Sequence, residues 1–412
     1  MPQSEPDARR RTPRTDVVLA DPRLQDATDR LGRSRVKDAV TDALQRVRDG
    51  ELDPDSVIDH VVSGLPGSAS SLRSVINATG VVVHTNLGRA PLSAAAIDAM
   101  VTAAGHTDVE LDLLTGRRGP RGRGALTALA AAVPDAGSVH VVNNGAAALA
   151  LVTCALAAGR EVVVARGELV EIGDGFRIPE LLESVGARLR EVGTTNRVHL
   201  ADYEAAVGSD TAFVLKVHPS NFRVQGFTSS VPVEGLAALG VPVVADIGSG
   251  LLSAHPRLPD EPDASSTLRA GAALVTASGD KLLGGPQCGL ILGDAALVAE
   301  VRRFPLARAM RVDKLTLAAL EATLSGPTPP WSPLSRCARR TSSAGPGGSL
   351  TPSGPTWPRR CRPRQRSAAV APLESSCRAR RCRCRPCWLT HCAPETHRWP
   401  ATSPVAGCCW TC

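Results

Sequence analysis

The sequence of 412 residues predicts an α/β protein with a mostly parallel sheet, a small helical N-terminal domain and a disordered C-terminal tail. Three observations support this prediction. After Pro66, short valine-rich runs alternate with helical stretches, as in sheets whose parallel strands are joined by crossover helices. Before Pro66 the apolar residues follow helical spacing, and after about residue 326 the apolar pattern of a folded core is lost.

The N-terminal part of the chain predicts a short disordered segment followed by a helical domain. Residues 1–20 are polar and lack the apolar run of a secretory signal, so we expect them to be disordered. Residues 21–66 carry apolar side chains at helical spacing, which predicts helices that end at Gly50. The apolar positions are Leu31, Val36, Val40, Leu44 and Val47.

The outer face of these predicted helices is basic. It carries Arg30, Arg33, Arg35, Lys37, Arg46 and Arg48. A solvated helix face is the more ordinary explanation of such a pattern. A surface that contacts the phosphates of an RNA is the alternative, and it stays open on charge alone.

Residues 67–326 predict the large α/β domain. The expected strands lie in "VHVVNN", "REVVVARGE", "ARLREVGTT", "TAFVLKVHPSN", "VPVVADIGSG" and "AALVTASGDK". Helical stretches such as "IPELLESVG" and "HLADYEAAVG" separate them. Ligands of such sheets bind beyond the carboxyl ends of the strands, so the residues at these ends are the first candidates for a functional site.

Residues 327–412 have the composition of an aberrant tail. From Trp331 onward there are 14 arginines, no lysine and only two acidic residues, and this stretch holds ten of the twelve cysteines. A metal knuckle is disfavoured because the cysteines do not form two clean CxxC pairs. An arginine-rich nucleic-acid tail is a second possibility. A composition rich in arginine, proline, serine and cysteine best matches GC-rich coding sequence translated in a shifted frame. We therefore expect these residues to be the disordered product of a frameshift.

The body of the chain predicts a cytoplasmic protein. Outside the tail it has two cysteines, Cys154 and Cys288, which fits a reducing compartment better than a disulfide scaffold. No apolar run approaches the roughly 18 residues of a membrane span, so no membrane partner is expected.

Three features at the predicted strand ends match the needs of pyridoxal phosphate (PLP). Asn143, Asn144 and Gly145 begin a helix whose N-terminus can hold a phosphate. Asp246 follows a buried strand, where it could be a helix cap or the partner of a pyridinium nitrogen. Lys281 follows a later strand and could bind the cofactor aldehyde, although a solvated turn lysine is the commoner case. The ordered set favours the cofactor interpretation.

Several longer motifs resemble the bacterial selenocysteine synthase family, the L-seryl-tRNA(Sec) selenium transferases. They are "VINATGVVVHTNLGRAPLS", "ELDLLTGRRGPRG", "ARGELVEIGDGFRIPE", "VGTTNRVHLADYE", "SGDKLLGGPQCGLILG" and "PLARAMRVDKLTLAALEATL". The resemblance runs from about residue 20 to residue 326 and stops where the composition breaks. The family continues into a small C-terminal domain at this point.

The resemblance implies a PLP enzyme of fold type I that assembles as a homo-oligomer, a ring of dimers. It implies serine esterified to tRNA(Sec) as substrate, selenophosphate as selenium donor, and β-elimination followed by selenium addition as chemistry. By motif, Lys281 matches the cofactor lysine and Asp246 its pyridinium partner. Arg89, Arg308 and Arg311 match arginines of the donor's anion pocket, which is sensible for guanidinium groups.

Some assignments stay open in the sequence. His218 could contact the cofactor or be a core histidine. The phosphate loop reads "NNG" where the family more often has a third asparagine. The alternative functions are a related PLP lyase acting on a small amino or sugar acid, or an inactive frameshifted product that at best binds RNA through its charge.

Overall fold

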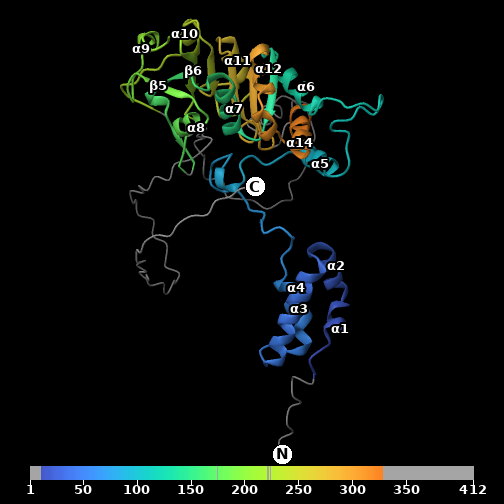
Figure 1. Cartoon of the computed structure of the whole chain (residues 1–412). Helices are drawn as coiled ribbons and strands as arrows, with labels where there is room; N and C mark the ends of the chain where they lie inside the picture. Colours follow the sequence, from blue (N-terminus) through green and yellow to red (C-terminus); the bar gives the residue numbers. More distant parts are fainter. Residues whose placement is uncertain (1–10, 174, 220–221, 223, 328–412) are drawn as a thin grey trace, which may run out of the picture. The chain divides into compact units, whose positions relative to one another are not determined.

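The computed structural model describes residues 11–173, 175–219, 222 and 224–327 (Figure 1). The predictions for the C-terminal tail fall on residues 328–412 and lie outside the described residues. The described chain contains a helical N-terminal domain and a large α/β domain.

The N-terminal domain is a set of short helices around one small core. Its elements are α1 (Thr15–Leu19), α2 (Pro22–Leu31), α3 (Arg33–Arg48), η2 (Pro54–Ser56) and α4 (Val57–Gly64). The predicted apolar positions are confirmed, since Val36, Val40 and Leu44 are at most 1% exposed. The range predicted to be disordered contains α1, because Val18 is 2% exposed and packs into the same core.

The large domain is built on a seven-stranded sheet with the order β1-β9-β8-β7-β6-β2-β5. The strands are β1 (Ser138–Val142), β2 (Glu161–Ala165), β5 (Arg188–Val192), β6 (Thr211–Val217), β7 (Val243–Asp246), β8 (Leu274–Ser278) and β9 (Gly289–Gly293). The pairs from β5 through β8 are all parallel, and only β9 runs antiparallel to its neighbours β8 and β1. The mostly parallel sheet is therefore confirmed.

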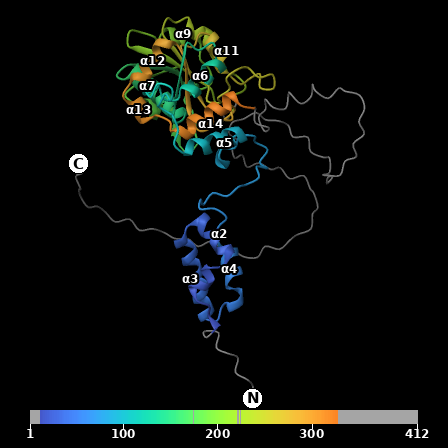
Figure 2. The same ribbon diagram turned by 90° about the vertical axis from the view of Figure 1, so that its right-hand side faces the viewer.

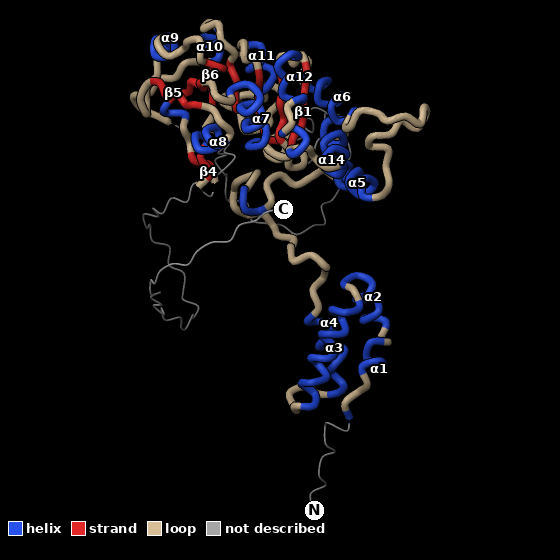
Figure 3. The backbone as a smooth tube through the Cα atoms, in the orientation of Figure 1, coloured by secondary structure: helices blue, strands red, loops and turns tan. Residues whose placement is uncertain are grey.

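Helices cover both faces of this sheet, as Figure 3 shows for the strands in red and the helices in blue. The helices are α5 (Ala94–Ala104), α6 (Arg123–Ala132), α7 (Gly145–Ala157), α8 (Ile178–Ser184), α9 (Leu200–Glu204), α10 (Val233–Ala237), α11 (Ala264–Arg269), α12 (Ala295–Arg303), α13 (Leu306–Ala309) and α14 (Lys314–Ser325). One face packs on α7, α8 and α12. The other packs on α6, α9, α10, α11 and α14. Figure 2 shows α5 and α14 side by side.

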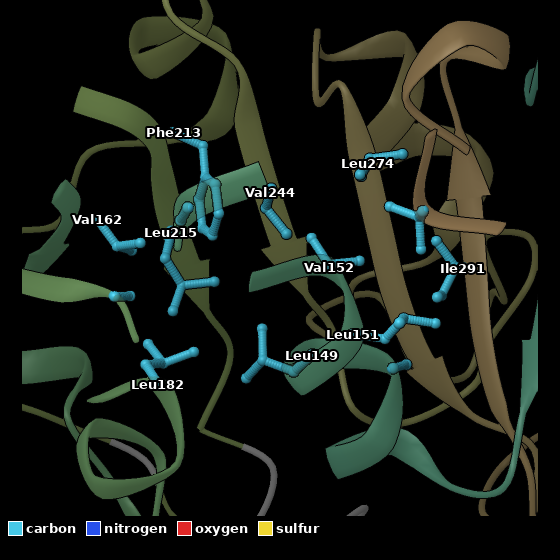
Figure 4. Close-up of a cluster of buried hydrophobic side chains, with 14 of the residues drawn as sticks. Leu149, Leu151, Val152, Val162, Leu182, Phe213, Leu215, Val244, Leu274 and Ile291 are labelled. Atoms are coloured by element: carbon cyan, nitrogen blue, oxygen red, sulfur yellow. The ribbon is translucent and has the colours of Figure 1, made fainter. Parts of the chain in front are cut away.

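The two-residue period of the strands explains why both faces are apolar. Val162 and Val164 of β2 pack in the cluster on α7, whereas Val163 packs on the opposite face. Figure 4 shows side chains of α7, such as Leu149, among strand residues that include Phe213. Strands buried on both sides need continuous apolar runs, which is the pattern in the sequence.

Two small elements were not among the predicted strands. β9 follows the glycine-rich turn after β8 and returns along it, with Ser278 opposite Gly289. A short hairpin pairs β3 (Glu171–Ile172) with β4 (Phe176–Arg177). No helix among the described residues is long and apolar enough to cross a membrane.

Candidate active site

The turn after β8 fixes Lys281 between two strand ends. Gly279 N–H donates to Cys288 O at 2.8 Å and Gly285 N–H donates to Gly279 O at 2.9 Å, which closes the turn at its base. Leu282 N–H donates to Ser249 O at 2.8 Å and ties the turn to the loop after β7. The lysine therefore has little backbone freedom.

Asp246 lies at the carboxyl end of β7, between β6 and β8. Thr276 Oγ1 of β8 donates to Asp246 Oδ1 at 3.0 Å. Desolvation raises the pKa of the Asp246 carboxyl, while the positive charge of Lys281 and hydrogen bonds from Thr276 and the Gly248 N–H lower it. Desolvation outweighs these three contacts, so the pKa of Asp246 lies above its ordinary value.

Lys281 and Asp246 form an electrostatically linked pair. Burial lowers the pKa of Lys281, and the repulsion from Arg89 adds to this effect. Asp246, Asp280 and Glu261 oppose it through their negative charges. A lysine with a lowered pKa has more neutral amine at a given pH, which both a nucleophile and a general base require.

The N-terminus of α7 has the geometry of an anion cradle. The helix has 13 residues and begins at Gly145, and Asn144 caps it by accepting a hydrogen bond from Ala147 N–H at 2.8 Å. A Cβ on Gly145 would lie 2.6 Å from Ser278 Oγ, so only glycine lets the helix start approach the end of β8 this closely. Backbone N–H groups, a helix dipole and a serine hydroxyl together suit a phosphate.

Asn143 makes different contacts from its neighbours in the loop. Its N–H donates to Met310 O at 3.0 Å. Its side-chain amide lies 3.1 Å from two carbonyl oxygens, Met310 O and Arg311 O, and because both are acceptors the amide is assigned with its NH₂ toward them. The loop therefore joins the helix start to the connection between α13 and α14.

Arg89 is the only non-glycine residue with a positive φ in the part of the chain that the structure describes, at 63°. Its Nη1 donates to Asp280 Oδ2 at 2.9 Å, and Ala90 N–H donates to Asp280 O at 3.1 Å. Asp280 is buried, with 6% of its surface exposed. A strained backbone held by two contacts to the residue before Lys281 marks Arg89 as a candidate functional residue.

Arg308 and Arg311 lie on a separate segment of the chain. Arg308 lies on α13 and is exposed, and Arg311 follows it in the connection to α14. The Arg311 Nη1 lies 3.5 Å from Glu110 Oε1. Arg89 pairs with Asp280 and Arg311 with Glu110, so within the described residues the two arginines share no carboxylate partner.

His218 lies directly after β6, and its N–H donates to Asp246 O at 2.9 Å. Desolvation, with the nearby charges of Lys216 and Lys281, lowers the pKa of His218 and favours its neutral form. Glu168 accepts hydrogen bonds from Lys216 Nζ and, at 2.9 Å, from Val217 N–H. The contacts of Glu168 hold the end of β6, and this places His218 next to the Asp246 backbone.

Three residues of the site were missed from the sequence. Ser278 meets the start of α7, Thr276 donates to Asp246, and Asp280 pairs with Arg89. All three lie within six residues of one another around the end of β8. Their positions close to Lys281 in the sequence could have identified them, because alternate residues at a strand end face the same side of the sheet.

Comparisons with known proteins agree over most of the described chain. A family model described as L-seryl-tRNA selenium transferase matches residues 75–329, and one described as selenocysteine synthase N terminal matches residues 9–48. The first match falls on the large α/β domain and the second on the helical N-terminal domain.

Two relatives, at 47% and 49% identity, support the same assignment. The L-seryl-tRNA(Sec) selenium transferase of Moorella thermoacetica is 47% identical over 330 residues, covering 76% of this chain and 70% of the relative. That of Solidesulfovibrio magneticus is 49% identical over 315 residues, covering 71% and 66%. A solved D-glucosaminate-6-phosphate ammonia-lyase aligns with a TM-score of 0.48 at 21% identity, over 59% of this chain and 65% of that one. On the family model and the relatives, the chain belongs to the L-seryl-tRNA(Sec) selenium transferase family.

Proposed function

We propose that this chain converts seryl-tRNA(Sec) to selenocysteinyl-tRNA(Sec), with PLP as cofactor and selenophosphate as selenium donor. Family membership supports the overall conversion. The single structural observation that carries the proposal is the convergence of Lys281, Asp246 and the α7 N-terminus at one edge of the sheet.

The residues present fit PLP. The start of α7, with Gly145 and Ser278, would hold the phosphate, and Asp246 would face the ring nitrogen. Lys281 would hold the aldehyde carbon. When bound, the cofactor supplies an electron sink that stabilises negative charge at the α-carbon of an amino acid.

Side chains of this protein would accept, return and hold the protons of the reaction. Neutral Lys281, whose pKa is lowered by burial, accepts the α-proton of the seryl group and can return it after selenium has been added. Burial raises the pKa of Asp246, whereas Lys281, Thr276 and the Gly248 N–H stabilise its charged form, in which it would hold a proton on the ring nitrogen. Neutral His218 beside Asp246 can pack on the cofactor without adding positive charge.

Arg89, Arg308 and Arg311 would bind the selenium donor. Several guanidinium groups suit a phosphate-like dianion, because each offers paired donors. Asp280 holds Arg89 at the start of the turn that carries Lys281. We propose that this contact keeps the donor close to the reacting carbon.

The N-terminal domain would bind the tRNA. Arg30, Arg33, Arg35 and Lys37 are exposed around the junction of α2 and α3, and none forms an ion pair with another described residue. In contrast, Arg14 and Arg23 of the same domain pair with aspartates. Unpaired basic side chains on one stretch can release counterions when they contact a phosphate backbone.

We also propose a homo-oligomer located in the cytoplasm. Large apolar side chains are exposed on the large domain, including Leu113 at 73%, Leu114 at 98% and Val101 at 70%. Such exposure is unusual for a monomer and fits a surface covered by a second copy. Light scattering of the purified chain at increasing concentration checks this point, with a mass above one chain expected.

Reduction of the cofactor-loaded protein with borohydride, followed by peptide mapping, tests the cofactor site. The chain contains four lysines, Lys37, Lys216, Lys281 and Lys314, so each is a separate candidate. We expect the cofactor mass on the Lys281 peptide and its loss in Lys281→Ala. Lys216→Ala is the matched control, because Lys216 lies at the same sheet edge but is paired with Glu168. Label on the Lys216 peptide of the unmodified chain would contradict the assignment.

A further inference from the structure

The connection between α13 and α14 is held by two loops that lie far from it in the sequence. With the Asn143 amide assigned so that its NH₂ faces them, Met310 O and Arg311 O accept hydrogen bonds from it at 3.1 Å each. Val312 O accepts one from Arg121 Nη2 at 2.9 Å. Three successive backbone carbonyls are therefore bound by side chains of other segments, which is unusual because most carbonyls pair within helices and strands.

The backbone supports this arrangement from the same side. Asn143 N–H donates to Met310 O at 3.0 Å, and Val142 of β1 forms an isolated antiparallel bridge with Arg311. At its far end the connection stops at Asp313, which caps α14 by accepting from Thr316 N–H at 2.9 Å. The segment that carries Arg311 is thus fixed at both ends.

Glu110, which pairs with Arg121, also orients the Arg311 side chain. Glu110 Oε1 lies 3.2 Å from Arg121 Nη1 and 3.5 Å from Arg311 Nη1. The hydrogen bond from Arg121 and the charges of the neighbouring arginines lower the pKa of Glu110, so this carboxyl stays charged. One carboxylate therefore links the guanidinium that holds Val312 to the guanidinium predicted to bind the donor.

The orientation of Asn143 argues against a direct role in holding a phosphate. Its backbone N–H and its side-chain NH₂ are turned to the carbonyls of residues 310 and 311. The remaining polar atoms are the side-chain and backbone carbonyl oxygens, which can only accept hydrogen bonds. A phosphate needs donors, and these are supplied by the neighbouring start of α7.

We propose that Asn143 is a positioning residue that sets the arginine-bearing segment for the anionic selenium donor, and is not a ligand of the cofactor phosphate. This inference rests on the proposed function, since it takes Arg311 as part of the donor site. It assigns the two neighbouring asparagines to different tasks. Asn143 orders the donor side of the site, and Asn144 orders the cofactor side.

The test compares Asn143→Ala with Asn144→Ala in the cofactor-loaded full chain. For Asn143→Ala we expect unchanged cofactor content and a rise of about tenfold or more in KM for selenophosphate, with a smaller change in kcat. For Asn144→Ala we expect weaker cofactor binding and a smaller change in that KM. Asn143→Ser, which keeps one donor, should lie between Asn143→Ala and the unmodified chain.

Hydrogen exchange of the peptide that covers residues 306–313 gives a second measurement that needs no turnover. We expect faster exchange in Asn143→Ala and unchanged exchange in Asn144→Ala. Loss of cofactor from Asn143→Ala with an unchanged KM for selenophosphate would overturn the inference, as would unchanged exchange. If the unmodified chain does not use selenophosphate, the proposed function fails, and the exchange result still decides whether Asn143 orders this segment.

Discussion

At the residue scale, burial lowers the pKa of Lys281 and the charge of Asp246 opposes this effect. Its negative charge raises the pKa of Lys281, against the lowering by burial. Removing the charge in Asp246→Asn should therefore lower the pKa of Lys281 further. The rate at which the apoprotein attaches the cofactor rises as the Lys281 amine loses its proton. The midpoint of the curve of this rate against pH should therefore move to lower pH in Asp246→Asn.

The pH dependence of this rate, followed by absorbance after mixing apoprotein with PLP, checks the direction of the shift. Thr276→Val is the matched control, because it removes a hydrogen bond to Asp246 but leaves the carboxyl group in place. It should shift the midpoint less than Asp246→Asn does. A midpoint that moves to higher pH in Asp246→Asn would show that burial is not opposed by Asp246.

Asp280 gives a second prediction at this scale. Asp280→Asn removes the ion pair that holds Arg89, whose backbone is already strained at φ 63°. Since hydrogen bonds to charged groups contribute about 1.5–3 kcal/mol, KM for selenophosphate should rise by roughly 10- to 100-fold while the cofactor stays bound. Steady-state kinetics with varied donor measures this, and a loss of cofactor with an unchanged KM would contradict it.

The residues of the site differ in how well the sequence predicts them. Lys281 and Asp246 could be proposed because Asp246 ends a valine-rich strand and Lys281 lies three residues beyond the end of the next strand. Asp280 and Thr276 could not, because their roles depend on contacts with Arg89 and with a neighbouring strand. The role of Asn143 depends on which way its amide faces, and only the carbonyls at positions 310 and 311 determine that.

At the scale of elements, the contact between α7 and β8 determines how closely the phosphate cradle approaches Lys281. Gly145→Ala places a methyl group 2.6 Å from Ser278 Oγ, and such overpacking should destabilise the apoprotein by about 1–3 kcal/mol. In the double variant Gly145→Ala with Ser278→Ala, the nearest atom is the Cβ of residue 278 at 3.8 Å, so most of this loss should be recovered.

Denaturant unfolding of the two single variants and the double variant measures this coupling. Ser278→Ala alone should cost less than Gly145→Ala. If the losses of the two single variants simply added in the double variant, the close contact would not be the cause.

The elements themselves follow from the sequence unevenly. The parallel strands could be predicted because valine-rich runs alternate with helical stretches along the chain. β9 was missed, because its apolar run follows a turn and pairs antiparallel, a register that is set by the contacts of Gly279 and Ser278. The helix α1 was missed because a five-residue helix gains its stability from packing of Val18, which periodicity cannot reveal.

At the scale of the whole molecule, the two domains should have separable tasks. Reversing the charge of Arg33, Arg35 and Lys37 to glutamate should weaken tRNA binding and reduce its salt dependence, because fewer counterions are released. Cofactor content should not change. Filter binding at several salt concentrations measures both quantities, with Arg14→Glu as control, since Arg14 is paired with Asp16. Equal weakening by Arg14→Glu would indicate a general charge effect and not a binding surface.

The origin of residues 328–412 stays a prediction from composition, and resequencing the coding region around residue 330 tests the proposed frameshift. The proposed frameshift bears on activity, because the resemblance to the family ends where the altered composition begins. The described domains nevertheless contain all the residues assigned to the cofactor, the donor and the tRNA.

The most direct test of the central claim follows the fate of serine on the tRNA. Seryl-tRNA(Sec) with radiolabelled serine is incubated with the cofactor-loaded chain and selenophosphate, and the amino acid is then released and identified. We predict labelled selenocysteine with the unmodified chain and unchanged labelled serine with Lys281→Ala. Conversion by Lys281→Ala at the rate of the unmodified chain, or consumption of free serine in place of the tRNA ester, would contradict the account.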